Sequence, residues 1–251
     1  MKKENDLTED EFLKQYNPDK YKKPSVTADI LIFSMNEECQ LELLLIQRGG
    51  HPYQGKWALP GGFVGISESI DDAARRELVE ETGLKDIYLE QLYTFGSVNR
   101  DPRMRVISVA YMALLSKRKI TPKAGDDAAA AKFFRVYMDN WMLKFKAEDG
   151  TELTVDDLAF DHREVIQMGL TRLAGKVDYT DIAFELLEDK SCFTIYELQR
   201  IYECIKGAPI DAGNFRKLFK NRFIKDGLVK ELEMVSKRFS KKPSKCYEYK
   251  G

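Results

Sequence analysis

Histidine is scarce in this sequence, and its scarcity narrows the chemistry that the chain can support. His51 and His162 are the only two histidines in 251 residues. Catalytic triads that need histidine and metal sites built from several histidines are therefore poor candidates, whereas carboxylate chemistry is favoured. The four cysteines are scattered and include no CxxC pair, which argues against a structural zinc site and indicates reduced thiols in a cytoplasmic protein.

Long apolar runs are also missing. No stretch approaches the roughly 18 residues that a membrane-spanning helix requires, so we expect no membrane partner. The first twelve residues, MKKENDLTEDEF, lack the apolar segment of a signal peptide. A hydrophobic share of 43% and a charged share of 32% are typical of a globular protein.

Charge is nearly balanced overall but unevenly distributed. The net charge is −1, yet the segment from Ser191 to Gly251 has 14 Lys and Arg against 7 Asp and Glu, a net +7. The preceding part of the chain is therefore acidic. An acidic body followed by a basic tail indicates two domains with different partners, although a basic surface that is merely solvated is an equally good interpretation of charge alone.

Apolar patterning divides the chain into a polar arm over residues 1–24, a first domain over 25–176 and a second over 177–251. The arm contains one short helix, expected after Thr8, which forms a capping-box pair with Glu11. The first domain mixes strands with helices, the latter expected between Ser69 and Gly83 and over Asp161–Leu173. Its expected strands are Val26–Phe33, Leu41–Gln47, Ile87–Phe95, Val106–Leu115 and Ala131–Val136. This order of elements predicts an α/β (α+β) fold.

The second domain has consecutive helical patterns followed by two strand-like segments. The helices are expected over Asp181–Leu187, over Ile195–Ile205, and from the N-cap Asp211 to about Lys225. The strand-like segments Leu228–Met234 and Cys246–Tyr249 enclose the loop SKRFSKKPSK. A helix, a turn, a second helix and a two-stranded wing predict a winged helix-turn-helix domain.

Three glutamates crowd about one and a half turns of the helix between Ser69 and Gly83. Glu80 and Glu81 follow Glu77 by three and four positions, so each shares a face with it, and like charges at that spacing destabilise a helix by a few tenths of a kcal/mol per pair. A cation over the cluster would offset this repulsion. The cluster therefore indicates a cation site.

The same segment carries a longer motif. Gly62 is followed after five residues by Glu68, after seven more by Arg76-Glu77-Leu78, and then by Glu80-Glu81 and Gly83-Leu84. This spacing resembles the box that defines the Nudix hydrolases. The flanking segments QRGGHPYQGKWALPGGF and SVNRDPRMRVISVAYMAL are similar to Nudix hydrolases that act on ADP-ribose and related dinucleotides. The resemblance implies an α/β/α sandwich and hydrolysis of a nucleoside diphosphate linked to another group.

The resemblance also implies roles for individual residues. The metal would be Mg²⁺ or Mn²⁺, since magnesium takes oxygen ligands and commonly bridges carboxylates to phosphates. Glu77 and Glu81 would be its principal ligands, Glu80 would share or assist, and the backbone carbonyl near Gly61 would be a further ligand. Arg76 and Glu68 would form a structural ion pair, with Gly62 and Gly83 as further structural positions of the box.

The general base of such a reaction stays open between two sets of residues. Some relatives use a box glutamate, here Glu80 or Glu81, and others use a loop beyond the box, where Asp126 and Asp127 lie in this sequence. A pair of aspartates near a glycine is also typical of a turn or a helix cap.

Candidate substrate contacts lie on both sides of the box. Arg100 and Arg103 flank Asp101-Pro102, and the planar guanidinium of arginine suits phosphate groups. The alternative is a charged hairpin tip. Arg48 and Trp57 lie in the upstream segment that resembles ADP-ribose hydrolases, where Trp57 could stack on a base or pack in the core.

The tail, FTIYELQRIYECIKGAPIDAGNFRKLFKNRFIKDGLV, resembles the C-terminal winged helix of the Nudix-related transcriptional regulators. Its basic residues suit contacts with the phosphate backbone of duplex DNA. We expect two such domains, in a homodimer, to bind the DNA together. The alternative is a winged helix used for dimerisation or protein binding. The DNA-binding candidates are Asn214, Arg216, Lys217, Lys220, Asn221 and Arg222 on the helix and Lys237, Arg238, Lys241, Lys242 and Lys245 in the wing.

Two functions therefore compete. One is a metal-dependent pyrophosphatase for ADP-ribose with an appended DNA-binding domain, and the other is a DNA-binding regulator of NAD or sugar metabolism whose Nudix pocket senses an ADP-ribose-like ligand. Regulators of this kind often have a degraded box. Because the box is intact here, the sequence favours hydrolysis combined with DNA binding, with regulation alone as the alternative.

Overall fold

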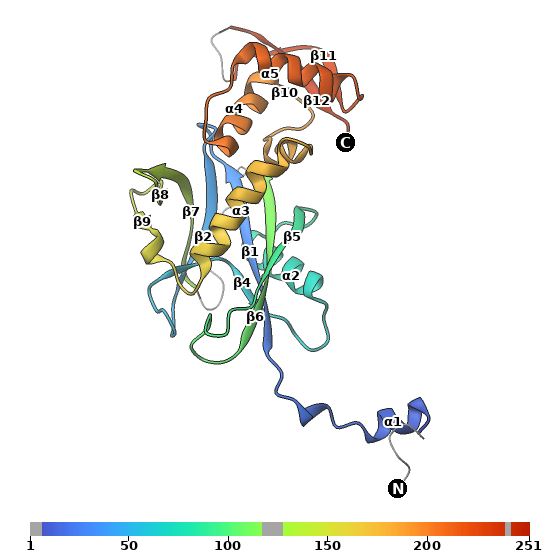
Figure 1. The fold of residues 1–251 in the computed structure, drawn as a ribbon. Helices are drawn as coiled ribbons and strands as arrows, with labels where there is room; N and C mark the ends of the chain where they lie inside the picture. The colour runs from blue at the N-terminus through green and yellow to red at the C-terminus, as the bar shows by residue number, and fades with distance from the viewer. Residues whose placement is uncertain (1–6, 117–127, 239–241) are drawn as a thin grey trace.

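The structure, a computed structural model, describes residues 7–116, 128–238 and 242–251. Figure 1 shows a larger unit built on a sheet, a smaller unit at one end that contains the C-terminus, and an N-terminal arm that leaves from the other end. Among the described residues, no helix is long and apolar enough to cross a membrane. The expected α/β architecture followed by a winged helix is confirmed.

The larger unit is organised around one mixed sheet. Its main path runs in the order β5-β6-β1-β2-β7-β8-β9, with β3 paired to β2 and β4 paired to β1. The β1–β6 pair is parallel, and the other pairs of this sheet are antiparallel. The strands are β1 (Ser25–Met35), β2 (Leu41–Arg48), β3 (Trp57–Ala58), β4 (Gly61–Phe63), β5 (Tyr88–Phe95), β6 (Val106–Ser116), β7 (Ala128–Asp139), β8 (Met142–Ala147) and β9 (Glu152–Thr154).

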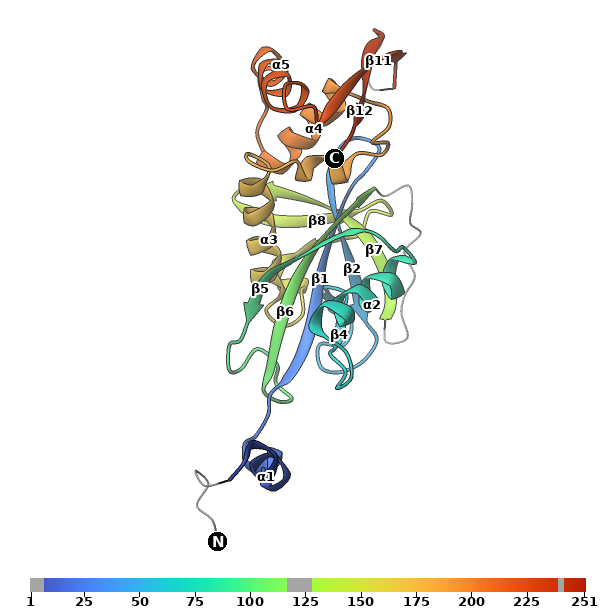
Figure 2. The same cartoon turned by 90° about the vertical axis from the view of Figure 1, so that its right-hand side faces the viewer.

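Strand β1 explains why helices cover both faces of this sheet. Side chains alternate between the two faces of a strand, and every residue from Ala28 to Met35 is buried. Leu31 and Phe33 belong to the core beneath helix α3 (His162–Lys176), whereas Ile30 and Ile32 belong to the core beneath helix α2 (Ile70–Thr82). The two helices lie on opposite sides of the sheet in Figure 2. The result is the expected α/β/α sandwich.

The arm is local structure without a core. Helix α1 (Glu9–Gln15) begins with the expected capping box between Thr8 and Glu11, and none of its residues is buried. A 3₁₀ turn, η2 (Pro18–Lys20), follows it. Both figures show the arm extending away from the sheet.

The smaller unit contains the expected winged helix. Its three-stranded sheet has the order β10-β12-β11, so the wing strands β11 and β12 pair as predicted. Its aromatic rings come from several elements: the buried ring of Phe184 contacts Phe193, Phe223 and Tyr249. The elements are η5 (Ile182–Leu186), β10 (Phe193–Thr194), α4 (Ile195–Lys206), α5 (Ala212–Phe219), η6 (Lys220–Ile224), β11 (Val229–Ser236) and β12 (Ser244–Tyr249).

Two elements of this unit differ from the sequence prediction. The first expected helix is the 3₁₀ segment η5, and the helix expected to run from Asp211 to about Lys225 changes after Phe219 into one π-helical turn, η6.

The short strands of both units were not predicted, because two to six residues carry too little periodicity. They are β3, β4, β8 and β9 in the larger unit and β10 in the smaller one.

One apolar core joins the two units. Buried residues of the sheet, of α3 and of the winged helix form a single contiguous cluster. The β1–β2 hairpin also reaches α4, where the backbone N–H of Leu41 donates to Sγ of Cys204 at 2.9 Å. The winged helix is therefore packed against the sheet rather than attached by a linker alone.

Close packing of α3 on β1 predicts opposite effects for two glycines in this helix. A Cβ on Gly169 would lie 2.4 Å from Cδ2 of the buried Leu31, whereas a Cβ on Gly175 would meet no atom within 4 Å. Replacing glycine by alanine inside a helix gains about 1 kcal/mol, and overpacking a core costs about 1–3 kcal/mol. We expect Gly175→Ala to raise the free energy of unfolding and Gly169→Ala to lower it by roughly 1 kcal/mol net in urea titrations. Equal stabilisation by both would contradict this packing.

Candidate functional site

Local sequence signals set both ends of the helix that carries the glutamates. The hydroxyl of Ser69 accepts a hydrogen bond from the N–H of Asp72 and donates to its carboxylate, so the helix begins at the expected N-cap. Gly83 ends it with a φ of 70°, in the left-handed region that favours glycine. These caps place the three glutamates of the box beside strand β4.

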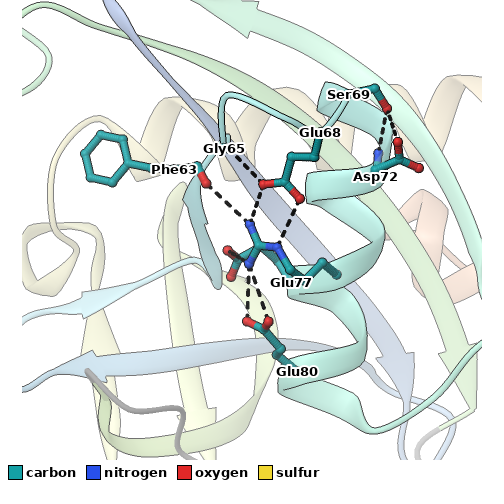
Figure 3. Close-up of polar contacts among 8 residues, drawn as sticks. Phe63, Gly65, Glu68, Ser69, Asp72, Glu77 and Glu80 are labelled. Atoms are coloured by element: carbon teal, nitrogen blue, oxygen red, sulfur yellow. Dashed lines mark hydrogen bonds and ion pairs between the residues drawn. The ribbon is translucent and has the colours of Figure 1, made fainter.

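Arg76 connects the acidic residues of the site (Figure 3). Its guanidinium donates to both carboxylate oxygens of Glu68, at 3.2 and 3.0 Å, and to Glu77 at 2.7 Å. Longer bonds of 3.4 Å reach both oxygens of Glu80. Glu68 also accepts from the N–H of Gly65 at 2.8 Å, so the expected Arg76–Glu68 ion pair is present and holds the loop before the helix. The Arg76 bond, followed by the Gly65 bond, lowers the pKa of Glu68.

The three glutamates differ in burial. Glu77 and Glu81 are buried, whereas the side chain of Glu80 is 56% exposed. Burial raises the pKa of Glu77. Burial, followed by the charges of Glu77 and Glu80, raises the pKa of Glu81 to about 7, and one of its carboxylate oxygens is buried without a hydrogen-bond partner.

Two adjacent glycines let strand β4 approach these carboxylates. A Cβ on Gly62 would lie 2.1 Å from a carboxylate oxygen of Glu77. Gly61 has a φ of 152°, and a Cβ there would lie 2.2 Å from the carbonyl oxygen of Ala28. Side chains at either position would therefore push β4 away from the glutamates or from β1.

The donor set suits a hard divalent cation. Glu77, Glu80 and Glu81 supply carboxylate oxygens, and the orphaned oxygen of Glu81 and its raised pKa are both features that a bound cation would relieve. In the described part of the chain, no three such groups already converge on one point. Arg76 is the cation that the glutamates contact, since it bonds to Glu77 and Glu80.

A cavity of about 290 Å³ lies beside the glutamates. It reaches the glutamate cluster through Gly61, Gly62 and Phe63, and it is lined by basic, aromatic and acidic side chains from β1, β2, β4, the loop before β6 and the start of α3. Its other lining residues are Thr27, Asp29, Ile46, Arg48, Gly50, His51, Ala58, Leu59, Arg100, Asp101, Arg103, Val106, Phe160 and His162.

Arg100 forms a buried ion-pair network at this cavity. Its guanidinium donates to Asp161 at 2.9 and 2.7 Å and to Asp29 at 3.3 Å, and its side chain is only 4% exposed. His162 lies beside it and accepts the N–H of Leu59 on Nδ1 at 2.9 Å. Burial lowers the pKa of His162, so the ring is neutral with its proton on Nε2, which faces Asp29 at 3.9 Å.

Arg48 and Arg103 lie in the same cavity as Arg100 but in different contacts. Arg48 donates to the carbonyl of Pro52 at 2.8 Å and lies over the ring of Phe160. Arg103 pairs with Asp101 at 2.8 Å, and its side chain is 41% exposed. Three of the four expected substrate contacts therefore line one cavity, although the charge of Arg100 is already neutralised there by Asp161 and Asp29.

Trp57 is the fourth expected contact, and the structure gives it a packing role. Its side chain is buried, its ring packs edge-on against Phe134 at 4.8 Å between centroids, and it does not line the cavity. A stacking role for Trp57 is therefore replaced by a core role. Asp126 and Asp127, the alternative bases, lie outside the described residues.

The recognition-helix candidates divide into two groups. Asn214, Arg216, Lys217 and Lys220 are exposed on α5 and at the start of η6. Arg222 is instead half-buried and donates to the carbonyls of Val177, Asp178 and Thr180. The expectation that Arg222 contacts DNA is therefore corrected: its guanidinium satisfies backbone oxygens at the end of α3.

The wing shows a similar division. Arg238 is paired with Glu188 and lies 3.8 Å from Glu197, so it ties the wing to the body of its domain. Lys245 pairs with Glu231 across the wing hairpin. Lys242 is exposed, and Lys241 lies outside the described residues.

Comparison with protein families identifies both units. The NUDIX domain model matches residues 23–149, about half of the chain, and the NrtR DNA-binding winged helix domain model matches residues 183–249. The chain belongs to the Nudix family, with an NrtR-type winged helix. It is 34% identical to the "ADPR responsive transcriptional repressor NtrR" of Acinetobacter baylyi over 96% of this chain and 88% of that protein. It is 36% identical to the ADP-ribose pyrophosphatase of Methanocaldococcus jannaschii over 59% of this chain and 73% of that protein.

Solved structures agree with this assignment. A MutT/nudix family protein from Enterococcus faecalis covers 97% of this Nudix chain and 94% of its own, with a TM-score of 0.79 and 34% identity. NrtR of Shewanella oneidensis in complex with a 27mer DNA covers 90% and 93%, with a TM-score of 0.69 and 29% identity. The Nudix domain of that NrtR in complex with ADP-ribose covers 66% and 99%, with a TM-score of 0.53 and 31% identity.

Several site residues were missed by sequence reasoning. Asp29, Phe160, Asp161 and His162 all line or border the cavity, and none was proposed as a site residue. Asp29 follows apolar residues on a strand, and His162 opens a helix whose other buried residues are apolar. A polar residue within such a buried pattern was the available signal.

The raised pKa of Glu81 predicts a pH-dependent loss of stability in protein without divalent cations. The carboxyl titrates at about 7 in the folded chain against an ordinary value of 4.5, so stability falls as pH rises through this interval. Glu81→Gln removes the titrating group and should spare the protein about 1–3 kcal/mol of that loss, after allowance for solvent screening. Thermal unfolding in EDTA at pH 5 and pH 8 measures the difference. The exposed change Glu164→Gln is the control, and parallel pH profiles for wild type and Glu81→Gln would contradict the assignment.

Proposed function

We propose that this Nudix protein is a transcriptional regulator that binds duplex DNA through its winged helix and senses ADP-ribose or a related nucleotide in its Nudix cavity. The observation that carries the proposal is the union of both parts in one packed chain with 34% identity to an ADP-ribose-responsive repressor over 88% of that repressor. This similarity supports regulation more than hydrolysis, whereas the intact box favoured hydrolysis combined with DNA binding.

The exposed face of the recognition helix supports DNA binding. Three exposed cations lie on α5 and at the start of η6: Arg216, Lys217 and Lys220. Lys242 is a further exposed cation, in the wing. Cations in this arrangement suit phosphate contacts, and Asn214 at the helix start suits a base edge. The related NrtR of Shewanella oneidensis was solved with a 27mer DNA. A single winged helix contacts few base pairs, so we propose that the protein acts as a homodimer on two half-sites.

The cavity supports a nucleotide ligand with a diphosphate. Arg48 and Arg103 supply positive charge, and the rings of Phe63 and Phe160 lie beneath these guanidinium groups. Such a mixture of cations and apolar rings suits a charged linker with flat or ribose-like ends. ADP-ribose has this chemistry, and the Nudix domain of the related NrtR was solved with it.

Hydrolysis of the bound nucleotide is the second candidate, because every position of the Nudix box is present. Glu77 and Glu81 would hold Mg²⁺ or Mn²⁺ with Glu80 and the carbonyl near Gly61. The bound cation would neutralise charge on the phosphate oxygens and lower the pKa of an attacking water. Glu80, whose carboxylate is solvent-exposed, or Glu81 would accept the proton.

If the exposed lysines of the recognition helix contact DNA phosphates, DNA affinity should depend on salt concentration in a predictable way. Changing Lys217 and Lys220 together to Gln should weaken binding to promoter fragments of the protein's own operon and to random DNA alike. If both lysines contact phosphates, the slope of log K against log salt should fall in magnitude by about 1.8, or roughly 0.9 for each contact. Arg216→Gln should instead reduce discrimination between the two DNAs. Lys146→Gln, on β8, is the matched control, and an unchanged slope in the double variant would count against a DNA-reading helix.

Hydrolysis predicts a defined product pair. With Mg²⁺ and ADP-ribose, AMP and ribose 5-phosphate should appear in equal amounts, and Glu81→Gln should remove most of the turnover while the circular dichroism spectrum is kept. Glu164→Gln, an exposed change on α3, should turn over like wild type. A Glu81→Gln protein with full turnover would contradict the metal assignment. Wild-type protein without turnover that still binds ADP-ribose would leave sensing as the role of the cavity.

A further inference from the structure

Helix α3 is the element that connects the Nudix cavity to the winged helix. It has 15 residues, so it spans about 22 Å at 1.5 Å per residue. Figure 1 shows it running along the sheet toward the unit that contains α4 and α5. Each end of the helix is held by side chains of a different unit.

The first end of α3 is bonded to the cavity wall. Asp161, the residue before the helix, accepts two hydrogen bonds from Arg100, and His162, its first residue, accepts one from the N–H of Leu59. Arg100 and His162 both line the cavity. A ligand that draws Arg100 toward a phosphate or contacts His162 therefore acts directly on the start of α3.

The middle of α3 is packed as a rigid body. Val165, Ile166 and Leu173 are buried against the sheet, and Gly169 allows close approach to Leu31. Closely packed elements move as units rather than deforming along their length. A displacement of the first end would therefore reach the second.

The second end of α3 is hydrogen-bonded to Arg222, which follows the recognition helix α5. The guanidinium of Arg222 donates to the carbonyls of Val177 at 3.1 Å and Asp178 at 2.7 Å, and also to that of Thr180. These carbonyls lie just beyond the helix, where backbone oxygens lack intrahelical partners and a cation is favoured. Arg222 belongs to η6, the π-helical turn that continues α5. One side chain thus joins the end of α3 to the helix that carries the DNA-binding candidates.

We propose that α3 transmits ligand occupancy of the Nudix cavity to the recognition helix, with Arg222 as the positioning residue. The inference rests on the proposed function, because it requires a wild-type protein whose DNA affinity responds to the ligand. A ligand shifts a conformational equilibrium only through a difference in its contacts with the two states, and Arg100 and His162 are the cavity residues through which such a difference would reach α3. Arg222 acts through α3 and touches neither ligand.

The test compares DNA binding with and without ADP-ribose in wild type and in Arg222→Met. Couplings between two sites commonly change affinity about 5–150-fold. Wild type should show a change in that range. Arg222→Met should bind ADP-ribose within about threefold of wild type, but its DNA affinity should change less than twofold on adding ADP-ribose.

A second readout needs no DNA. ADP-ribose should change amide hydrogen exchange over residues 212–224 in wild type, and this change should be absent in Arg222→Met while exchange around the cavity still responds. If Arg222→Met does not fold, Arg222→Lys replaces it, since lysine keeps the charge but lacks the planar fork that bonds to several carbonyls at once. The change Arg172→Met, which removes an exposed cation from α3 itself, is the control and should leave coupling at the wild-type level.

The outcomes separate the inference from the function on which it rests. Wild-type protein whose DNA affinity ignores ADP-ribose would overturn the proposed function. A responsive wild type with an equally responsive Arg222 variant would leave that function standing and overturn the role of Arg222. Loss of response in Arg172→Met as well would overturn the specific role of the hydrogen bonds from Arg222.

Discussion

The packing of α3 against β1 is the contact on which both halves of this protein depend. Gly169 allows the helix to lie close over Leu31, and this contact completes one face of the sandwich. It also fixes Asp161 and His162 at the cavity and presents the far end of the helix to Arg222. Sheet, ligand cavity and winged helix are therefore built on one rigid element.

Arginine side chains in this chain divide between structural and surface roles. Arg76, Arg100, Arg222 and Arg238 bond to internal carboxylates or carbonyls. The pairs of Arg100 are buried, and buried ion pairs contribute little net stability although loss of one partner is costly, so they hold geometry more than they add free energy. Arg216 on the recognition helix is exposed, whereas Arg103 at the cavity is partly exposed and pairs with Asp101.

Local features of the fold could be predicted from the sequence, and features that depend on distant partners could not. The caps of α2, the capping box of α1 and the Arg76–Glu68 pair join residues at most eight positions apart, and their patterns were visible in the sequence. The hydrogen bonds of Arg222 join residues 42 to 45 positions apart, and the His162–Leu59 hydrogen bond joins residues 103 positions apart. Composition placed Arg222 among the DNA contacts because an arginine on a basic helix has that role until its acceptors are known.

Reciprocal binding tests the account most directly, because coupling between two ligands must be equal in both directions. Calorimetric titration of ADP-ribose into free protein and into the protein–DNA complex gives two dissociation constants. The account predicts that they differ by the same factor by which ADP-ribose changes DNA affinity, between about fivefold and 150-fold. Equal dissociation constants for free and DNA-bound protein would contradict a regulator whose Nudix cavity controls its winged helix.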